Sequence, residues 1–181
     1  MKHLIALVGM PGSGKSAAGN FFKQKGIPVL RFGDVTDKGL KAQGLELTQE
    51  NERPFRENLR KELGMAAYAI KMEPEIREVL EHADIVVLDG MYSWEEYEYV
   101  KERFPFLQVI TIFASPQVRY ERLHSREIRP LTEEEAQIRD RAEITKLNKG
   151  GPIAMADYMI PNEGSQEDLE QKLADLLQKL Q

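Results

Sequence analysis

The sequence is organised around one stretch near its start, Gly9-Met10-Pro11-Gly12-Ser13-Gly14-Lys15-Ser16. It matches the pattern G-x-x-x-x-G-K-[ST] and lies between an apolar run at 4–8 and a helical pattern over 16–25. Glycines let successive backbone N–H groups turn toward a phosphate, because no side chain blocks the approach. The start of the following helix adds its dipole at the same place. The stretch therefore predicts a loop that binds the phosphates of a nucleoside triphosphate.

Two side chains of this loop have specific chemical tasks. Lys15 supplies a mobile positive charge for the β- and γ-phosphates, and the Ser16 hydroxyl is placed to ligate Mg²⁺. A chance turn rich in glycine and serine is the alternative, but it does not explain why the whole pattern is met between a strand and a helix. We therefore expect residues 9–16 to bind ATP and Mg²⁺, with Lys15 also acting on the transferring phosphoryl group.

Apolar runs and helical patterns alternate along the rest of the chain. The runs that read as buried strands are 4–8, 27–31, 85–88, 107–113 and 158–160. Helix starts are marked by capping boxes at Ser93 and Thr132, by Pro116 at a first helical position and by Ser165 before a leucine stripe. Gly64 is expected to break or bend a helix, and Pro74 to lie at the start of another. This order predicts an α/β, three-layer P-loop NTPase fold, with a parallel sheet of about five strands flanked by helices.

Length, charge and cysteine content limit the class of protein. A chain of 181 residues suits one compact α/β domain, so we expect a single domain over 1–181. Its net charge of −5 argues against a nucleic-acid partner, since duplex binding needs a basic face. The chain has no cysteine, which excludes disulfides and thiolate zinc sites. No apolar stretch approaches the roughly 18 residues of a membrane span, so we expect a cytoplasmic protein, monomeric or weakly homo-oligomeric.

Two aspartates follow predicted strands at the edge of the sheet where functional side chains gather. Asp89 ends the run 85–88, where it can hold Mg²⁺, contact Ser16 and border the acceptor; a strand-terminal turn residue is the alternative. Asp34 follows the second strand, where it can accept a proton from an acceptor hydroxyl or position the acceptor. A turn-forming Gly-Asp pair would look the same.

Arginines on the helical segment 48–73 form the candidate acceptor site. Arg53, Arg56 and Arg60 recur at i, i+3 and i+7, so one helix face is expected to carry all three guanidiniums. Such a face can grip a phosphate bidentately. Glutamates interleave with these arginines, so surface ion pairs of little energetic value are the alternative. We expect Arg56 and Arg60 to bind the acceptor.

A second group of arginines surrounds the polar segment 122–141, which resembles a lid of helix, brief loop and helix. The group comprises Arg119, Arg122, Arg126, Arg129, Arg139 and Arg141. Charge in phosphoryl transfer is spread over the equatorial oxygens, so arginines that swing onto them accelerate the reaction. Exposed helical arginines are common, and only some of the group are expected to matter. We predict Arg126 and Arg139 as catalytic residues and Arg122 as a nucleotide-binding residue.

These motifs together resemble a known group of enzymes. The phosphate loop is similar to that of nucleoside monophosphate kinases, the adenylate kinase group, and Gly33-Asp34 and 87–90 occupy matching places. The stretch 156–165 is similar to the corresponding part of dephospho-CoA kinases. The matches run collinearly over most of the chain, which thus resembles an adenylate-kinase-related P-loop kinase between these two families. The resemblance implies that Asn162 lies where related kinases contact adenine, mostly through backbone.

Departures from both families leave the acceptor open. Asp37 stands where a nucleoside monophosphate kinase usually has an arginine, and Tyr92-Ser93 replaces its usual Pro-Arg. The sequence predicts an ATP-dependent kinase of a small, nucleotide-like acceptor, similar to nucleoside monophosphate kinases. A dephospho-CoA kinase that phosphorylates a ribose hydroxyl is one alternative, and an ATP-binding switch without a small-molecule acceptor is another.

Overall fold

The computed structural model describes residues 2–127 and 130–180. Its strands are β1 His3–Val8, β2 Val29–Arg31, β3 Ile85–Asp89, β4 Leu107–Phe113 and β5 Tyr158–Pro161. Its helices are α1 Lys15–Gln24, α2 Asp34–Ala42, α3 Gln49–Leu63, α4 Ala67–His82, α5 Trp94–Arg103, α6 Pro116–Ser125, α7 Glu133–Leu147, α8 Gly150–Ala154 and α9 Gln166–Leu180. The strands form one parallel sheet in the order β2-β3-β1-β4-β5. The predicted α/β fold with a parallel sheet is confirmed.

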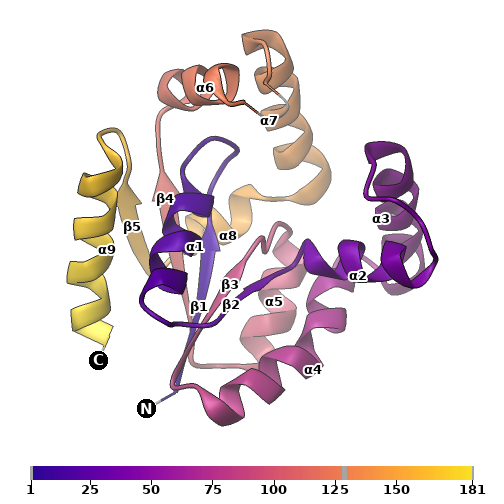
Figure 1. Cartoon of the computed structure of the whole chain (residues 1–181), viewed down its shortest axis with the longest axis horizontal. Coiled ribbons are helices and arrows are strands. Elements are labelled where there is room, and N and C mark those ends of the chain that lie inside the picture. Colours follow the sequence, from indigo (N-terminus) through magenta and orange to yellow (C-terminus); the bar gives the residue numbers. More distant parts are fainter. Residues whose placement is uncertain (1, 128–129, 181) are drawn as a thin grey trace.

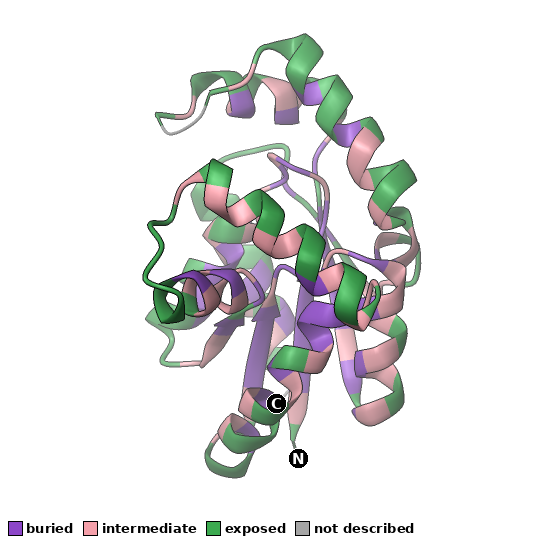
Figure 2. Cartoon of the chain, turned by 90° about the vertical axis from the view of Figure 1, so that its right-hand side faces the viewer, coloured by how far each residue is buried: buried purple, intermediate pink, exposed green. Residues whose placement is uncertain are grey.

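Helices cover both faces of the sheet, which gives three layers (Figure 1). The alternating side chains of β1 divide between two cores. Leu4 and Ala6 face the core that includes Met72 of α4 and Val100 of α5. Ile5 and Leu7 face the core made with α1 and α9. Figure 2 shows the central strands almost wholly buried, as expected for strands that are apolar on both faces.

The carboxyl ends of the strands carry the loops that matter for function. β1 runs directly into residues 9–14, and its pairing with β3 sets Leu7 opposite Asp89. The pairing of β2 with β3 sets Arg31 opposite Asp89 on the other side. In Figure 1, α6 and α7 lie above this edge, and α3 lies to the right of the sheet. The end of β3 is therefore flanked by the ends of β1 and β2.

Most predicted helix boundaries are confirmed, with one error. Ser93 and Thr132 both form complete capping boxes, and Gly64 ends α3 at φ 79°. The predicted helix start at Pro74 is wrong, because Pro74 lies inside the continuous helix α4. Proline removes one hydrogen bond of a helix interior, but burial of neighbours such as Met72 and Ile76 against the sheet holds the helix together.

Sequence patterns do not predict α2 or α8. The first has few apolar residues, of which Leu40 is buried, and the second is only a short turn of helix rich in glycine. Across residues 2–127 and 130–180, no helix combines the length and apolar character that crossing a membrane requires.

Candidate active site

The glycine-rich loop packs so closely on its neighbours that side chains cannot replace its glycines. Gly12 has φ +79°, and a Cβ there would lie 2.6 Å from the carbonyl oxygen of Arg119. Gly14 has φ +103°, and a Cβ there would collide with the amide of Asn162. Both conditions are met only by glycine. The pattern read from the sequence thus corresponds to a loop whose backbone packs against α6 on one side and against Asn162 on another.

Lys15, the first residue of α1, reaches back across the loop. Its ammonium donates to the carbonyl oxygens of Gly9 at 2.9 Å and Met10 at 3.0 Å. Burial and, to a smaller extent, the nearby Lys149 lower the pKa of Lys15 to about 7, against opposing contributions from Glu143 and Asp89. A phosphate anion at the loop would favour the charged form. The lysine is therefore poised to gain charge when phosphates arrive.

The predicted metal ligands lie on adjacent elements. The carboxylate of Asp89 faces α1 at Gly19, where an added Cβ would lie 3.8 Å from Oδ2, and exposed Ser16 lies one helical turn earlier. Burial raises the pKa of Asp89, while Lys15 and Arg31 oppose that shift. No cluster of three metal-binding His, Cys, Asp or Glu residues occurs among the described residues. A hydroxyl and one carboxylate, completed by phosphates and water, form an oxygen donor set that fits Mg²⁺.

Asn162 supports the loop through its side chain. Its amide nitrogen donates to the carbonyl oxygen of Ser13 at 2.8 Å. Its backbone N–H donates to Phe113 O, and its carbonyl accepts from Nη1 of Arg122 at 2.9 Å. Arg122 also donates to Gly164 O at 3.3 Å. The structure therefore gives Asn162 and Arg122 a role in fixing the 162–164 turn behind the loop, and their contact with a nucleotide stays a prediction.

Arg119 joins the loop to both helices of the segment above it. Its guanidinium forms a bidentate pair with Asp140 of α7 at 3.0 and 2.6 Å, and Nη1 also donates to Pro11 O at 3.0 Å. Nε donates to Ala114 O at 3.2 Å. Only 5% of the Arg119 side chain is exposed. Of the arginines near the predicted lid, this one is an internal tie rather than a ligand for a phosphate.

Two cavities flank α3 and share a wall. One of about 360 Å³ lies between α3 and the end of β2, lined among others by Gly33, Thr36 and Tyr68. The second, of about 540 Å³, lies between α3 and the α6–α7 segment. The residues common to both linings are Glu52, Arg56, Arg60 and Tyr92. The structure thus brings both arginines predicted to bind the acceptor to one hollow surface.

The arginines of α3 do not all share one face. Arg56 pairs with Glu52 at 2.9 Å, and the Arg60 guanidinium lies 5.3 Å from the ring centre of Tyr68, with its buried Nε lacking a hydrogen-bond partner. Arg53 lines neither cavity and pairs instead with Glu57 in solvent, at 2.9 Å. Arg53 therefore corresponds to the alternative of a surface ion pair, and of the three arginines Arg56 and Arg60 line the cavities.

Asp34 lies beside the smaller cavity without lining it. It occupies the first position of α2, and its carboxylate pairs with Nη1 of Arg31 at 3.2 Å. Its neighbours Gly33 and Asp37 do line the cavity. The negative charge of Asp34 also contributes to the raised pKa of Asp89, so the two carboxylates interact electrostatically at the same edge of the sheet. Whether Asp34 takes a proton or positions the acceptor stays a prediction.

The remaining arginines of the 122–141 segment lie on different surfaces of the molecule. Arg126 and Arg139 line the larger cavity together with Arg56 and Arg60. Arg141 lies on a different, outer surface of α7. Arg129 lies outside the described residues. Two arginines predicted as catalytic thus share a cavity with the two predicted to bind the acceptor.

Two cavity-lining residues and one buried residue that contacts both of them were not predicted from the sequence. In the sequence Tyr92 stands out only as part of the departure from the usual Pro-Arg, yet it lines both cavities. Glu143 lines the larger cavity and forms ion pairs with Arg139 and Lys149. No spacing or motif marks Lys149, which follows α7 by two residues and becomes buried only through tertiary packing.

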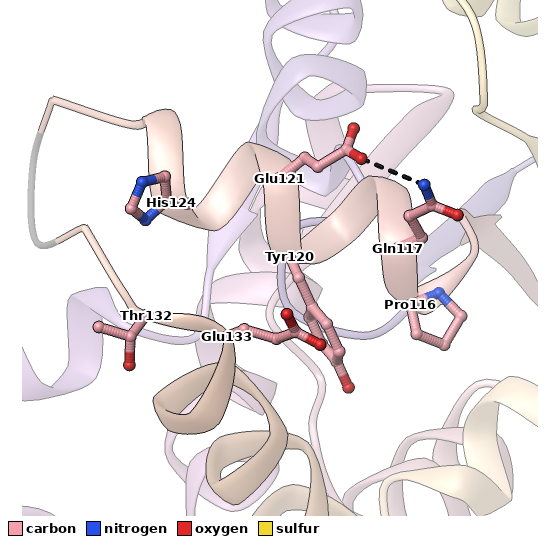
Figure 3. Close-up of a pocket in the computed structure, with 7 residues that line it drawn as sticks. All are labelled: Pro116, Gln117, Tyr120, Glu121, His124, Thr132 and Glu133. Carbon is pink, nitrogen blue, oxygen red and sulfur yellow. Dashed lines mark hydrogen bonds between the residues drawn. The ribbon is translucent and has the colours of Figure 1, made fainter.

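A further cavity, about 640 Å³, lies on the outer side of α6 and the start of α7 (Figure 3). Its lining includes Tyr120, His124 and Thr132 and shares no residue with the two cavities beside α3. Gln117 and Glu121 bond to each other there at 3.4 Å. None of the predicted site residues lines it, so we do not assign phosphoryl transfer to it.

Solved structures with a similar fold include a shikimate kinase. TT1252 from Thermus thermophilus superposes with a TM-score of 0.66 and 23% identity, covering 99% of this chain and 98% of that one. A shikimate kinase from Acinetobacter baumannii, solved in complex with shikimate, gives a TM-score of 0.60 and 20% identity over 100% and 96% of the two chains. These similarities show that the chain has a P-loop kinase-like fold.

Sequence comparison gives the family. The model of an AAA domain matches residues 5–144. A UPF0200 protein of Thermococcus gammatolerans is 37% identical over 181 residues, covering 98% of this chain and 95% of the relative. A UPF0200 protein of Methanocaldococcus jannaschii is 37% identical over 179 residues, covering 98% and 90%. The chain, with its P-loop set in an AAA domain, belongs to the UPF0200 family.

Proposed function

We propose that this protein is an ATP-dependent phosphotransferase that moves the γ-phosphate onto a small, nucleotide-like acceptor held beside α3. One observation carries the proposal: Arg56 and Arg60 of α3 and Arg126 and Arg139 of the α6–α7 segment line one cavity. Four guanidiniums converging from two segments suit a reaction in which anionic groups must meet. The named activities of structural neighbours, shikimate kinase and a gluconokinase from Sinorhizobium meliloti, support a small-molecule acceptor.

In this proposal each group of residues has a separate role in transfer of the γ-phosphoryl group. Backbone N–H groups of residues 9–14 and the Lys15 ammonium hold the β- and γ-phosphates. Ser16 and Asp89 hold Mg²⁺, which when bound neutralises phosphate charge. An acceptor oxygen attacks the γ-phosphorus while the bond to the β–γ bridging oxygen breaks and ADP leaves. Segment 122–141 acts as the lid, and its Arg126 and Arg139 stabilise the charge on the equatorial oxygens.

We place the acceptor in the class of nucleoside monophosphates, with segment 48–73 as its binding insert. An acceptor phosphate is already ionised at neutral pH and needs no general base. Asp34 is paired with Arg31 at 3.2 Å and does not line the cavities, which favours a positioning role. The position of Asp34 at the same sheet edge as Asp89 keeps a dephospho-CoA kinase as the second candidate, with Asp34 taking the proton of a ribose hydroxyl.

The test is ATP consumption with nucleoside monophosphates, nucleosides and dephospho-CoA as candidate acceptors. We expect a nucleoside monophosphate to accelerate ADP formation well above bare hydrolysis. Asp34→Asn separates the two candidates: it should weaken monophosphate binding modestly, whereas loss of a general base would lower kcat by about 100-fold or more. If no acceptor accelerates ADP formation, both kinase assignments fail and an ATP-binding switch takes their place.

A further inference from the structure

Lys149 is a buried cation that the reaction described above does not use. It lies between the end of α7 and the start of α8, and only 2% of its side chain is exposed. Its ammonium pairs with the carboxylate of Glu143 and lies 4.4 Å from the ring centre of Tyr92. Burying an ammonium is unfavourable unless its partners compensate for lost hydration. The placement of Lys149 therefore depends on Glu143 and on the Tyr92 ring.

The Glu143 carboxylate pairs with two cations, one buried and one partly exposed to solvent. Its Oε2 pairs with Lys149, while its Oε1 accepts from Nε of Arg139 at 3.1 Å. The Arg139 side chain is 46% exposed, and that of Glu143 is 13% exposed. Both Glu143 and Arg139 line the larger cavity. A fixed lysine thus holds one oxygen of a carboxylate, and the other oxygen holds the arginine that faces the cavity.

Electrostatics favour the charged form of Glu143, whereas burial lowers the pKa of Lys149 against the opposing effect of Glu143. Burial acts to raise the pKa of Glu143, but Lys149 and Arg139 together hold that pKa below its ordinary value. The carboxylate is therefore ionised at neutral pH and available to both cations. Lys149 lowers and Glu143 raises the pKa of Lys15, so the cluster lies close enough to the phosphate loop to interact with it electrostatically.

We propose that Lys149 is a positioning residue, which fixes the Glu143 carboxylate and through it directs the Arg139 guanidinium into the cavity. The catalytic use of Arg139 rests on the proposed function, but the positional link does not. Without Lys149, Glu143 retains only the exposed Arg139 as its partner and loses its rigid attachment. The Glu143 carboxylate can then rotate, and the Arg139 guanidinium bonded to it is no longer held in one orientation. A catalytic group misplaced by about 1 Å can slow a reaction by up to about 100-fold.

The positional link is tested without any acceptor, by NMR of the Arg139 Nε–H group in nitrogen-15-labelled protein. The resonance is assigned by its loss in Arg139→Lys. We expect Lys149→Met to shift it and to speed its hydrogen exchange, because the bond to Glu143 loses its anchor. Lys149→Arg should keep the resonance near its wild-type position. Lys146 is an exposed lysine of α7, the helix that carries Arg139 and Glu143. Lys146→Met is therefore the matched control and should leave the Arg139 resonance unchanged.

A folded Lys149→Met protein with an unchanged Arg139 resonance would overturn the inference. If that variant does not fold, Lys149→Gln, which removes the charge but can still donate a hydrogen bond to Glu143, takes its place and should give a smaller shift of the Arg139 resonance; no shift would again overturn the inference. Kinetics add a second readout once an acceptor is known. Lys149→Met should lower kcat by at least about 10-fold with little change in KM for ATP, and should have no further effect in an Arg139→Ala background. Equal effects in both backgrounds would show that Lys149 does not act through Arg139.

Discussion

Replacing Arg119 by methionine should destabilise the fold and loosen the link between the glycine-rich loop and α7. The substitution keeps much of the side-chain volume but removes the charge. Asp140 then remains as a carboxylate of which only 11% of the side chain is exposed, with Tyr120 Oη at 3.1 Å as a neutral partner. The carbonyl of Pro11 also loses its donor.

The magnitude follows from these contacts. Removing one partner of a buried ion pair lowers the free energy of unfolding by about 3 to 5 kcal/mol. For a chain of this size that corresponds to a fall in Tm of about 6 to 20 °C. In Arg119→Met/Asp140→Leu no buried charge is left unpaired, and the main losses are the hydrogen bonds to the carbonyl oxygens of Pro11 and Ala114, each worth about 1 kcal/mol. The double variant should therefore be more stable than the single one.

Urea denaturation followed by circular dichroism measures both variants against the wild type. Arg122→Met is a suitable control, because Arg122 is more exposed and bonds only to carbonyls of the 162–164 turn. If Arg119→Met loses less than about 1 kcal/mol, or if the double variant is less stable than the single one, the Arg119–Asp140 pair is not the internal tie that its geometry indicates.

The remaining predictions concern the reacting groups. At about pH 8, ATP binding should take up protons, since phosphates raise the pKa of Lys15 from about 7. The uptake should vanish in Lys15→Met and shrink near pH 6, as titration calorimetry in buffers of different ionisation enthalpy will reveal. Asp89→Asn should lower the Mg²⁺-dependent rate far more than nucleotide affinity without metal; equal losses in both would mark Asp89 as structural. Arg126→Ala or Arg139→Ala should lower kcat by about 100-fold with a smaller change in KM for ATP, whereas Arg141→Ala on the outer surface should not.

Local sequence patterns were sufficient for the fold and for the phosphate loop. Strands apolar on both faces, a glycine-rich turn and capping residues each depend on contacts within a few residues, so they can be recognised without a structure. The same holds for Ser93 and Thr132, whose capping boxes form as predicted. Pro74 was misread because the local preference against proline inside a helix was outweighed by burial of the apolar face of α4.

The walls of the cavities depend on contacts between residues far apart in the chain. Arg119 looked like its neighbours in sequence, and only the approach of Asp140 and Pro11 makes it internal. In the sequence Lys149 cannot be distinguished from a solvent-exposed lysine, and only its contacts with Glu143 and Tyr92 in the folded chain reveal its buried position. Such roles arise from tertiary packing, which a pattern of residue types along one helix does not specify.

Transfer of the γ-phosphoryl group itself is the most direct test of the proposed function. ATP radiolabelled at the γ-phosphate is incubated with Mg²⁺, the protein and each acceptor in turn, and the products are separated by chromatography. The proposal predicts label in a phosphorylated nucleoside monophosphate with the wild-type protein and none with Lys15→Met. Label that appears only as inorganic phosphate, whichever acceptor is supplied, would contradict it.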